Sequence, residues 1–409
     1  MKERKPITIV AMITAICLLG DSMLYIVLPV YWKDAGLESL WQVGILLSVN
    51  RFVRLPLNPV IGWLYNKMTL RTGLITAVLM GAITTVGYGL FKGFAIWFIL
   101  RCLWGVAWSF LRMGGYFTVI SYSNDGNRGH LMGSYNGISR LGSLVGMLVG
   151  GLLVPFLGLQ VVCLLFGIII LLGLPLILFF ISHKKVTDAF ASPTDKELNA
   201  ANRLWTIPVI RVLACGLMIA LLQAIFSSTL SLIIDTNYSG SVSIFGIILS
   251  STAFAGILQS ARWVWEPFLA PKIGRKSDGP RGRGPLFLLS LICAAAGYAM
   301  IAWELPVQFW IIIVLFVMMT GTATHTLMDA MASDTAKATS VIAVMTAYSV
   351  ATDLGSALGP MLTYLFIELE NGLLVVYFSS AAAYLGLMLW YRPVFSKKSV
   401  EQAERSSSS

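Results

Sequence analysis

Twelve apolar segments, separated by short polar breaks, constrain the fold of this chain more than any other feature. Each has roughly 20 or more residues, which is long enough to cross about 30 Å of hydrocarbon. Backbone groups in lipid must pair internally, and the strands of a membrane barrel would alternate in polarity instead of running continuously apolar. We therefore predict an all-α integral membrane protein with twelve transmembrane helices, at residues 6–31, 40–65, 72–91, 95–120, 131–156, 158–182, 204–233, 242–270, 284–303, 307–333, 339–366 and 372–392.

The composition and the placement of positive charge support this class. Of the 409 residues, 57% are hydrophobic and 12% are charged, which excludes an ordinary soluble chain. Most lysines and arginines between the segments lie at the termini and in alternate loops, whereas Lys33 and Lys92 lie on the other side. By the positive-inside rule, we expect both termini to be cytoplasmic in a multi-pass protein of the plasma membrane, in a bacterial cell. The net charge of +10 then follows from topology and requires no nucleic-acid partner.

The polar segment 183–203 separates the first six apolar segments from the last six. We expect an N-terminal six-helix half at 1–182, a cytoplasmic linker at 183–203, and a C-terminal half with a short cytoplasmic tail at 204–409. The fifth and eleventh segments carry glycines at similar spacing, as the two halves of a duplicated chain would. Close helix packing explains this spacing without any function. The residues are Gly142, Gly146, Gly150 and Gly151 in the first half, and Gly355, Gly359 and the following Pro360 in the second.

These two segments resemble the motif Gly-x3-Gly-Pro-x2-Gly-Gly in the fifth span of major facilitator superfamily antiporters. In the first copy Met147 replaces the proline, and in the second Thr363 and Tyr364 replace the paired glycines. The resemblance implies the two-halved major facilitator fold. The drug and metabolite proton antiporter branch is the nearest fit.

Two loops and the fourth segment extend this resemblance. The loops are similar to the family signature Gly-x-Leu-Ala-Asp-Arg-x-Gly-Arg-Lys, which in the family latches the cytoplasmic side through its acid. Neither loop keeps that acid, and Asn66 stands at its position in the first. Arg101 and Gly105 resemble the family's Arg-x3-Gly motif, whose arginine is linked to proton coupling. The loop residues expected to act in conformational change are Gly62, Asn66, Lys67 and Arg71 in the first copy, and Gly274 and Arg275 in the second.

Seven arginines lie within the apolar segments, where each costs roughly 2.5 to 3.5 kcal/mol on insertion scales. Arg211 can snorkel to the interface, and Arg262 is spaced for an ion pair with Glu266. The other five lie in the first half, where Asp21 is the one clear acid within a segment. A structural network would come closer to charge balance, so we expect an anionic ligand group, which the arginine fork binds well. The expected substrate-binding residues are Arg51, Arg54, Asn58, Arg101, Arg112 and Arg140.

The surroundings of these arginines lead to two further expectations. Pro56 and Pro59 should interrupt the second helix just below Arg54, freeing carbonyl groups toward a water-lined cavity. Several deep aromatic residues could flank a ligand, but packing between helices is the favoured interpretation. These aromatic residues are Trp104, Trp108, Tyr116, Trp263 and Trp265.

Four residues are expected to carry a coupled proton. Asp21 lies midway along the first segment, which resembles the position of an acid in several proton-driven exporters. His325 and Asp329 are four residues apart, and Asp353 lies near the middle of the eleventh segment. Burial makes a carboxylate easier to protonate, and histidine titrates near neutral pH. A histidine bonded to a neighbouring acid is also often structural, and that alternative stays open.

The sequence thus predicts a secondary active transporter, which exports a small anionic or zwitterionic organic metabolite in exchange for protons by alternating access. A carboxylated metal chelator would suit the arginines. The alternatives are an importer or exchanger of organic or phosphorylated anions, and a flippase for an anionic lipid headgroup. No motif indicates an enzyme, a resident metal or a cofactor, and the protein is expected to act in the lipid bilayer as a monomer.

Overall fold

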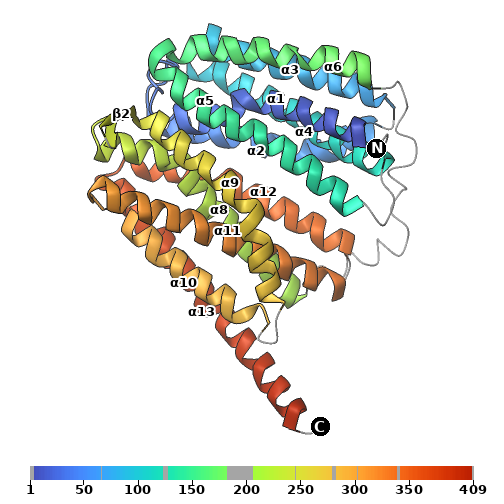
Figure 1. Cartoon of the computed structure of the whole chain (residues 1–409), viewed down its shortest axis with the longest axis vertical. Helices are drawn as coiled ribbons and strands as arrows, with labels where there is room; N and C mark the ends of the chain where they lie inside the picture. The colour runs from blue at the N-terminus through green and yellow to red at the C-terminus, as the bar shows by residue number, and fades with distance from the viewer. Residues whose placement is uncertain are drawn as a thin grey trace. The chain divides into compact units, whose positions relative to one another are not determined.

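The computed structural model describes residues 4–65, 67–122, 128–181, 206–244, 246–278, 282–301, 303–338 and 341–407. These ranges form twelve helices and one β-hairpin (Figure 1). The predicted all-α membrane class is confirmed. The predicted linker at 183–203 and the loop residue Asn66 lie outside the described residues.

The first half of the chain contains six helices. They are α1 (Arg4–Val27), α2 (Leu40–Tyr65), α3 (Leu70–Leu90), α4 (Phe94–Ser121), α5 (Arg128–Leu171) and α6 (Gly173–Phe180). At the start of α3 the Thr69 hydroxyl accepts a hydrogen bond from the Thr72 backbone N–H at 3.2 Å, which satisfies a donor that the helix leaves unpaired.

The helix α5 contains a bend that separates two of the predicted segments. Gly158 has φ +80° and ψ 157°, a backbone conformation that residues with a side chain rarely adopt. The predicted boundary between 131–156 and 158–182 therefore coincides with a real break. A second interruption follows at Leu172, after which α6 begins.

The second half contains helices α8 (Ile207–Asn237), α9 (Ser251–Ser277), α10 (Gly284–Ile301), α11 (Val307–Ala338), α12 (Val341–Ile367) and α13 (Gly372–Ser407). Between α8 and α9 lie the antiparallel strands β1 (Ser241–Ile244) and β2 (Ile247–Ser250). The prediction of a helix from residue 242 was therefore wrong for its first nine residues. Gly240 and Gly246 both have positive φ, and β-branched residues fill the strands, so this apolar run forms a hairpin.

Nine stretches of the described residues are long and apolar enough to span a membrane, and one of them, Leu131–Phe180, contains the bend at Gly158. The helices α2 and α9 fall outside this set, and both carry charged side chains midway. Pro56 and Pro59 do not interrupt α2, which runs unbroken from Leu40 to Tyr65. That expectation was wrong because the loss of two backbone donors does not end a helix held by its neighbours.

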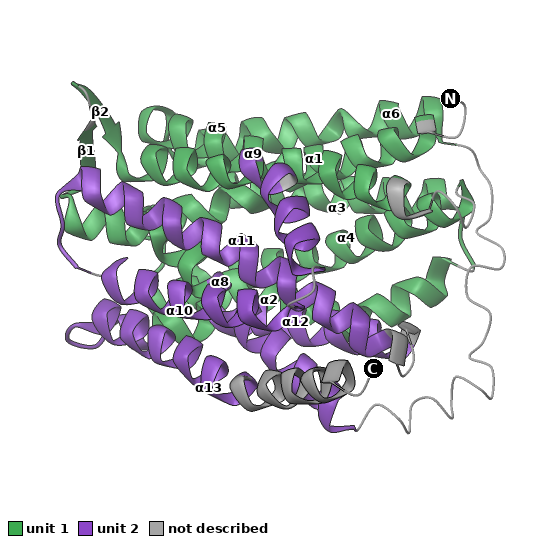
Figure 2. Ribbon diagram, turned by 60° about the horizontal axis from the view of Figure 1, so that its bottom comes forward, with its two compact units in different colours: residues 1–194, 225–263, 360–365 green, residues 195–224, 264–359, 366–409 purple. Residues whose placement is uncertain are grey.

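Two compact units are defined by contacts within the chain (Figure 2). Unit 1 consists of residues 1–194, 225–263 and 360–365, and unit 2 of residues 195–224, 264–359 and 366–409. Within unit 1, α1 packs along α5 and α2 packs against α4; within unit 2, α10 packs against α11 and α13. The division of the chain into halves at 183–203 stays a prediction.

Candidate functional site

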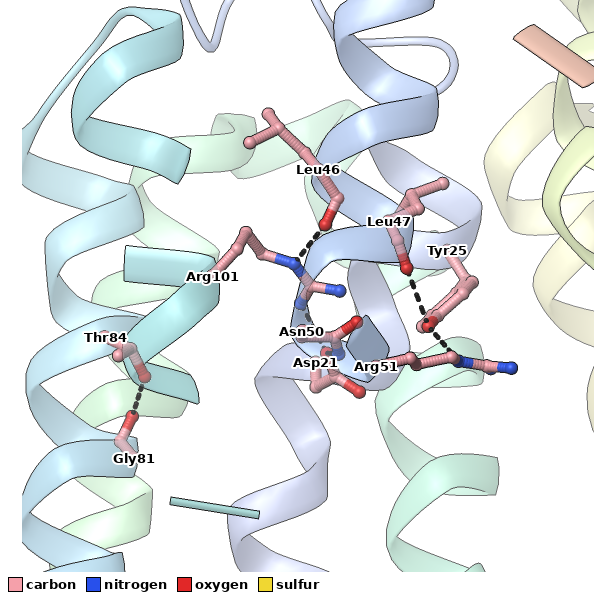
Figure 3. Close-up of polar contacts among 9 residues, drawn as sticks. All are labelled: Asp21, Tyr25, Leu46, Leu47, Asn50, Arg51, Gly81, Thr84 and Arg101. Atoms are coloured by element: carbon pink, nitrogen blue, oxygen red, sulfur yellow. Dashed lines mark hydrogen bonds and ion pairs between the residues drawn. The ribbon is translucent and has the colours of Figure 1, made fainter. Parts of the chain in front are cut away.

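A buried ion pair between Asp21 and Arg101 lies inside unit 1, where it joins α1 to α4 (Figure 3). The Arg101 side chain is completely buried, and that of Asp21 is 13% exposed. Arg101 Nε also donates to the Leu46 carbonyl oxygen of α2 at 2.7 Å. Asn50 Nδ2 donates to Asp21 Oδ1 at 3.4 Å, which adds a second contact from α2.

Asp21 and Arg101 neutralise each other's charge in this arrangement. Attraction between opposite charges strengthens in a low-dielectric interior, and leaving either charge alone there is strongly unfavourable. The structure thus places Arg101 on Asp21, the one clear acid within the first-half segments.

A second contact set adjoins the ion pair and contains Tyr25, Arg51 and the Leu47 carbonyl (Figure 3). Arg51 Nε donates to Tyr25 Oη at 3.2 Å, and Tyr25 Oη donates to the Leu47 carbonyl oxygen at 3.3 Å. The Arg51 guanidinium carbon also lies 5.5 Å from the centre of the Tyr25 ring. Tyr25 is buried, whereas Arg51 is partly exposed.

Three further predicted arginines of unit 1 lie against aromatic rings. The guanidinium carbons of Arg54, Arg112 and Arg140 lie 5.8, 5.7 and 5.3 Å from the ring centres of Trp108, Tyr116 and Trp263, respectively. Arg112 Nε additionally donates to Tyr116 Oη at 3.1 Å. Of the five deep aromatic residues, for which packing between helices was favoured, Trp108, Tyr116 and Trp263 therefore contact arginines, whereas Trp104 lies in the hydrophobic core.

The chemistry of these contacts suits the binding of anions. A ring attracts a guanidinium through its face. The N–H donors of the guanidinium lie in its plane and match the two oxygens of a carboxylate. A stacked arginine is therefore held in place by one surface while it can bind an anion by its edge.

Asn58 and Arg262 extend the same unit. Asn58 is partly buried on α2, four residues beyond Arg54. Arg262 on α9 lies with its guanidinium carbon 5.8 Å from the Trp263 ring centre, so one indole contacts both Arg262 and Arg140.

Unit 2 brings together two of the three remaining proton-coupling candidates. His325 Nδ1 lies 3.0 Å from Asp329 Oδ2, and Tyr348 of α12 donates its hydroxyl to Asp329 Oδ1 at 2.8 Å. The side chains of His325 and Asp329 are both more than 40% exposed. Asp353 is partly buried on α12, and none of the contacts described above includes it.

The predicted glycine motifs lie at close helix contacts. A side-chain carbon at Gly142 would collide with the Ala15 backbone, and one at Gly146 with the Leu19 backbone. Gly150 lies against the Met23 side chain of α1, so a side-chain carbon there would collide with it. In unit 2, Gly355 meets the Leu217 backbone of α8. Gly359 is buried beside it on α12, and Pro360 lies within that helix.

The two signature loops differ in their contacts. In the first, Lys67 lies 3.9 Å from the Trp63 ring centre; Gly62 is buried, and Arg71 lies in the first turn of α3. In the second, the Arg275 side chain bonds back to the Pro271 carbonyl oxygen at 3.4 Å, and Gly274 is in open surroundings.

An ion-pair cluster that the sequence did not predict follows the second loop. Arg283 pairs with Asp278 at 3.0 Å and with Asp334 at 2.7 Å. These acids provide negative charge near a loop that lacks the acid of the family signature.

Sequence reasoning missed two tyrosines of these sites. Tyr25 follows Asp21 by four residues, so the helical repeat places the two on one face of α1, and this signal was present. Tyr348 comes from a different helix from Asp329, and no spacing in the sequence connects them.

The helices, nine stretches of which are long and apolar enough to span a membrane within the described residues, define a multi-pass membrane protein. A family model described as Major Facilitator Superfamily matches residues 10–279, and the chain belongs to this family, which indicates a transporter rather than an enzyme.

Individual relatives are more distant. The chromaffin granule amine transporter of Homo sapiens is 28% identical over 158 residues, which is 38% of this chain and 30% of the relative. The synaptic vesicular amine transporter of Bos taurus is 31% identical over 155 residues, again 38% of this chain and 30% of the relative. The chain thus spans less than a third of the length of these relatives. The crystal structure of the nucleoside transporter NupG superposes with a TM-score of 0.76 at 15% identity, covering 97% of this chain and 99% of that one.

Proposed function

We propose that this transporter exchanges protons for a small anionic or zwitterionic organic metabolite. The observation that carries the proposal is the division among the arginines of unit 1. Arg101 is buried on Asp21, whereas the other predicted arginines lie against aromatic rings. The first arrangement suits a proton-sensitive lock, and the second suits a binding surface for carboxylate groups.

Asp21 is the proposed proton carrier for this exchange. Protonation neutralises its carboxylate, which weakens the hold on Arg101 while Arg101 keeps its charge. The pair then favours a different arrangement of α1, α2 and α4, the helices that it joins. The pair formed by His325 and Asp329 is a second proposed proton site, held by Tyr348.

The names of the relatives bear on the substrate. Both are amine transporters, and an amine is attracted to a carboxylate such as Asp21. Five arginines in the first half would repel a simple amine, so a zwitterion or a carboxylated metabolite fits this chain better. Contacts of the glycines on α5 and α12 would hold adjacent helices together while the protein alternates between its two states.

We further propose export across the plasma membrane, with both termini cytoplasmic and the monomer as the working unit. The glycine-rich α5 supports the antiporter assignment. An importer or exchanger of organic or phosphorylated anions would use the same arginines. A flippase for an anionic headgroup would use them also, and it would move labelled phosphatidylserine between the leaflets of liposomes.

The proposal is tested in proteoliposomes with an imposed pH gradient and a panel of labelled di- and tricarboxylates, amino acids and amines. The wild-type protein should move a carboxylated compound, and Arg54→Ala should reduce that transport about tenfold or more because a charge-assisted contact is lost. Asp21→Asn should bind the same compound without responding to the gradient. Lys33→Ala, outside the spans, serves as the control. Equal transport of amines by wild type and Arg54→Ala would contradict the anion assignment.

A further inference from the structure

The proposed proton site and the proposed substrate site share one turn of α2. Arg101 donates to the carbonyl of Leu46, and Tyr25 donates to the carbonyl of the next residue, Leu47. One helical turn later, Asn50 contacts Asp21, and Arg51 contacts Tyr25. Both contact sets therefore include α1 and residues 46–51 of α2, and the first set also includes α4 through Arg101 (Figure 3).

Tyr25 is the residue that links this turn to Arg51. Its hydroxyl donates to Leu47 and accepts from Arg51 Nε, so one oxygen atom serves both contacts. Its ring also lies under the guanidinium, and the residue is 7% exposed. Tyr25 thus contacts the Arg51 guanidinium in two ways, through a hydrogen bond to its hydroxyl and through its ring.

The helix α1 connects Tyr25 directly to the proton site. Asp21 lies one helical turn before Tyr25, so both side chains project from the same face of α1. A displacement of α1 relative to α2 at Asp21 therefore changes the contact between Tyr25 and Leu47 as well.

We propose that Tyr25 is the positioning residue that couples the protonation of Asp21 to the orientation of Arg51. When Asp21 is charged, α1 and α2 are held together through Arg101 and Asn50, and Tyr25 directs the edge of Arg51 toward substrate. When Asp21 is neutral, the hold weakens, and Arg51 turns with Tyr25. The inference rests on the proposed function, because it gives Asp21 the proton and Arg51 the substrate.

Several titratable or charged groups surround Asp21 in this arrangement. Arg101 approaches from α4 and Arg51 lies beyond Tyr25 on α2. Tyr88 of α3 interacts electrostatically with both Asp21 and Arg101, and Cys163 of α5 lies close to Tyr88. Arg51, the arginine assigned to substrate, donates from Nε to the Tyr25 hydroxyl.

The test measures the reactivity of Arg51 toward phenylglyoxal in the full-length protein at a single pH. Mass spectrometry of the Arg51 peptide gives the modification rate, and Arg51→Lys identifies the adduct. Asp21→Asn imitates the protonated acid. It should change the Arg51 rate roughly tenfold, since a hydrogen bond to a charged group contributes about 1.5 kcal/mol or more. In a Tyr25→Phe background the same Asp21→Asn change should alter the rate by less than about twofold, because no hydrogen bond remains to transmit it.

The matched control is Tyr65→Phe, which removes another buried tyrosine-to-carbonyl bond of unit 1, from Tyr65 Oη to the Phe110 carbonyl at 2.9 Å. This background should keep the full response to Asp21→Asn. An equal response in the Tyr25→Phe background would show that Tyr25 is not the link. The absence of any response in the wild-type background would show that no coupling exists between Asp21 and Arg51. Neither outcome changes the transport result for Arg54→Ala, so failure of the proposed function is recognised separately.

Discussion

The two units hold matching positions of their helices together in different ways. In unit 1 Asp21 of α1 pairs with Arg101 of α4. In unit 2 Gln223 of α8 donates through Nε2 to the Gly321 carbonyl of α11 at 2.7 Å. One contact is an ion pair between two charged side chains, and the other is a hydrogen bond between neutral groups.

The glycine contacts show that these positions correspond. Gly142 meets the backbone of Ala15, six residues before Asp21, and Gly355 meets that of Leu217, six residues before Gln223. The spacing along the chain is therefore the same in α1 and α8.

The tryptophans of α4 and α11 show a second correspondence. Trp97 Nε1 donates to the Phe91 carbonyl and Trp310 Nε1 to the Ile301 carbonyl, each at 2.9 Å. Four residues after Trp97 stands Arg101, and four after Trp310 stands the buried Val314. At these two positions the shared scaffold thus carries a charged residue in unit 1 and an apolar residue in unit 2.

The largest expected effect comes from breaking the charged contact on one side. Arg101→Leu leaves the Asp21 carboxylate buried without its partner charge and should destabilise the protein by about 3 to 5 kcal/mol. Thermal unfolding in detergent provides the measurement. Adding Asp21→Asn should recover much of the loss. If Arg101→Leu alone were as stable as the wild type, the ion pair would not stabilise the fold.

An intermediate effect is expected at the shared scaffold. Gly142→Val and Gly355→Val each place a side chain against the backbone of a neighbouring helix, and overpacking of this kind typically costs about 1 to 3 kcal/mol. Both variants should lower the unfolding temperature to a similar degree, with Gly133→Val, in open surroundings, as the control. A large difference between the two would argue against matching roles for the two helix contacts.

The smallest effect is expected at the neutral contact. Gln223→Ala removes one neutral hydrogen bond and should destabilise the protein by about 1 kcal/mol. The dependence of transport on the pH gradient should remain as in the wild type, in contrast to Asp21→Asn. Transport measurements at several gradients distinguish these results. If Gln223→Ala lost the dependence of transport on the pH gradient, proton coupling would involve unit 2 at this contact.

Sequence patterns predicted the helices well because continuous apolar length is a strong signal for a membrane span. They wrongly predicted a helix from residue 242, where the structure has a β-hairpin at 241–250. A short apolar run with β-branched residues is equally compatible with the start of a buried helix. Arg51 and Arg54 were correctly placed within a helix. Comparing acidic with basic residues in the first-half segments singled out Asp21. Contacts between helices, such as that of Trp108 with Arg54, depend on tertiary packing that no local pattern encodes.

The two prolines of α2 make one part of that helix easier to bend than the rest. Pro56 and Pro59 remove the backbone bonds that would normally reach the carbonyls of Phe52 and Leu55, just after Arg51 and within one residue of Arg54. Bending stiffness is therefore lowest at this level. The part of α2 on the Leu46 side is held by Arg101 and Tyr25, so the part after the prolines can bend without moving these contacts. Flexibility in this helix is thus localised beside the arginines rather than spread along its length.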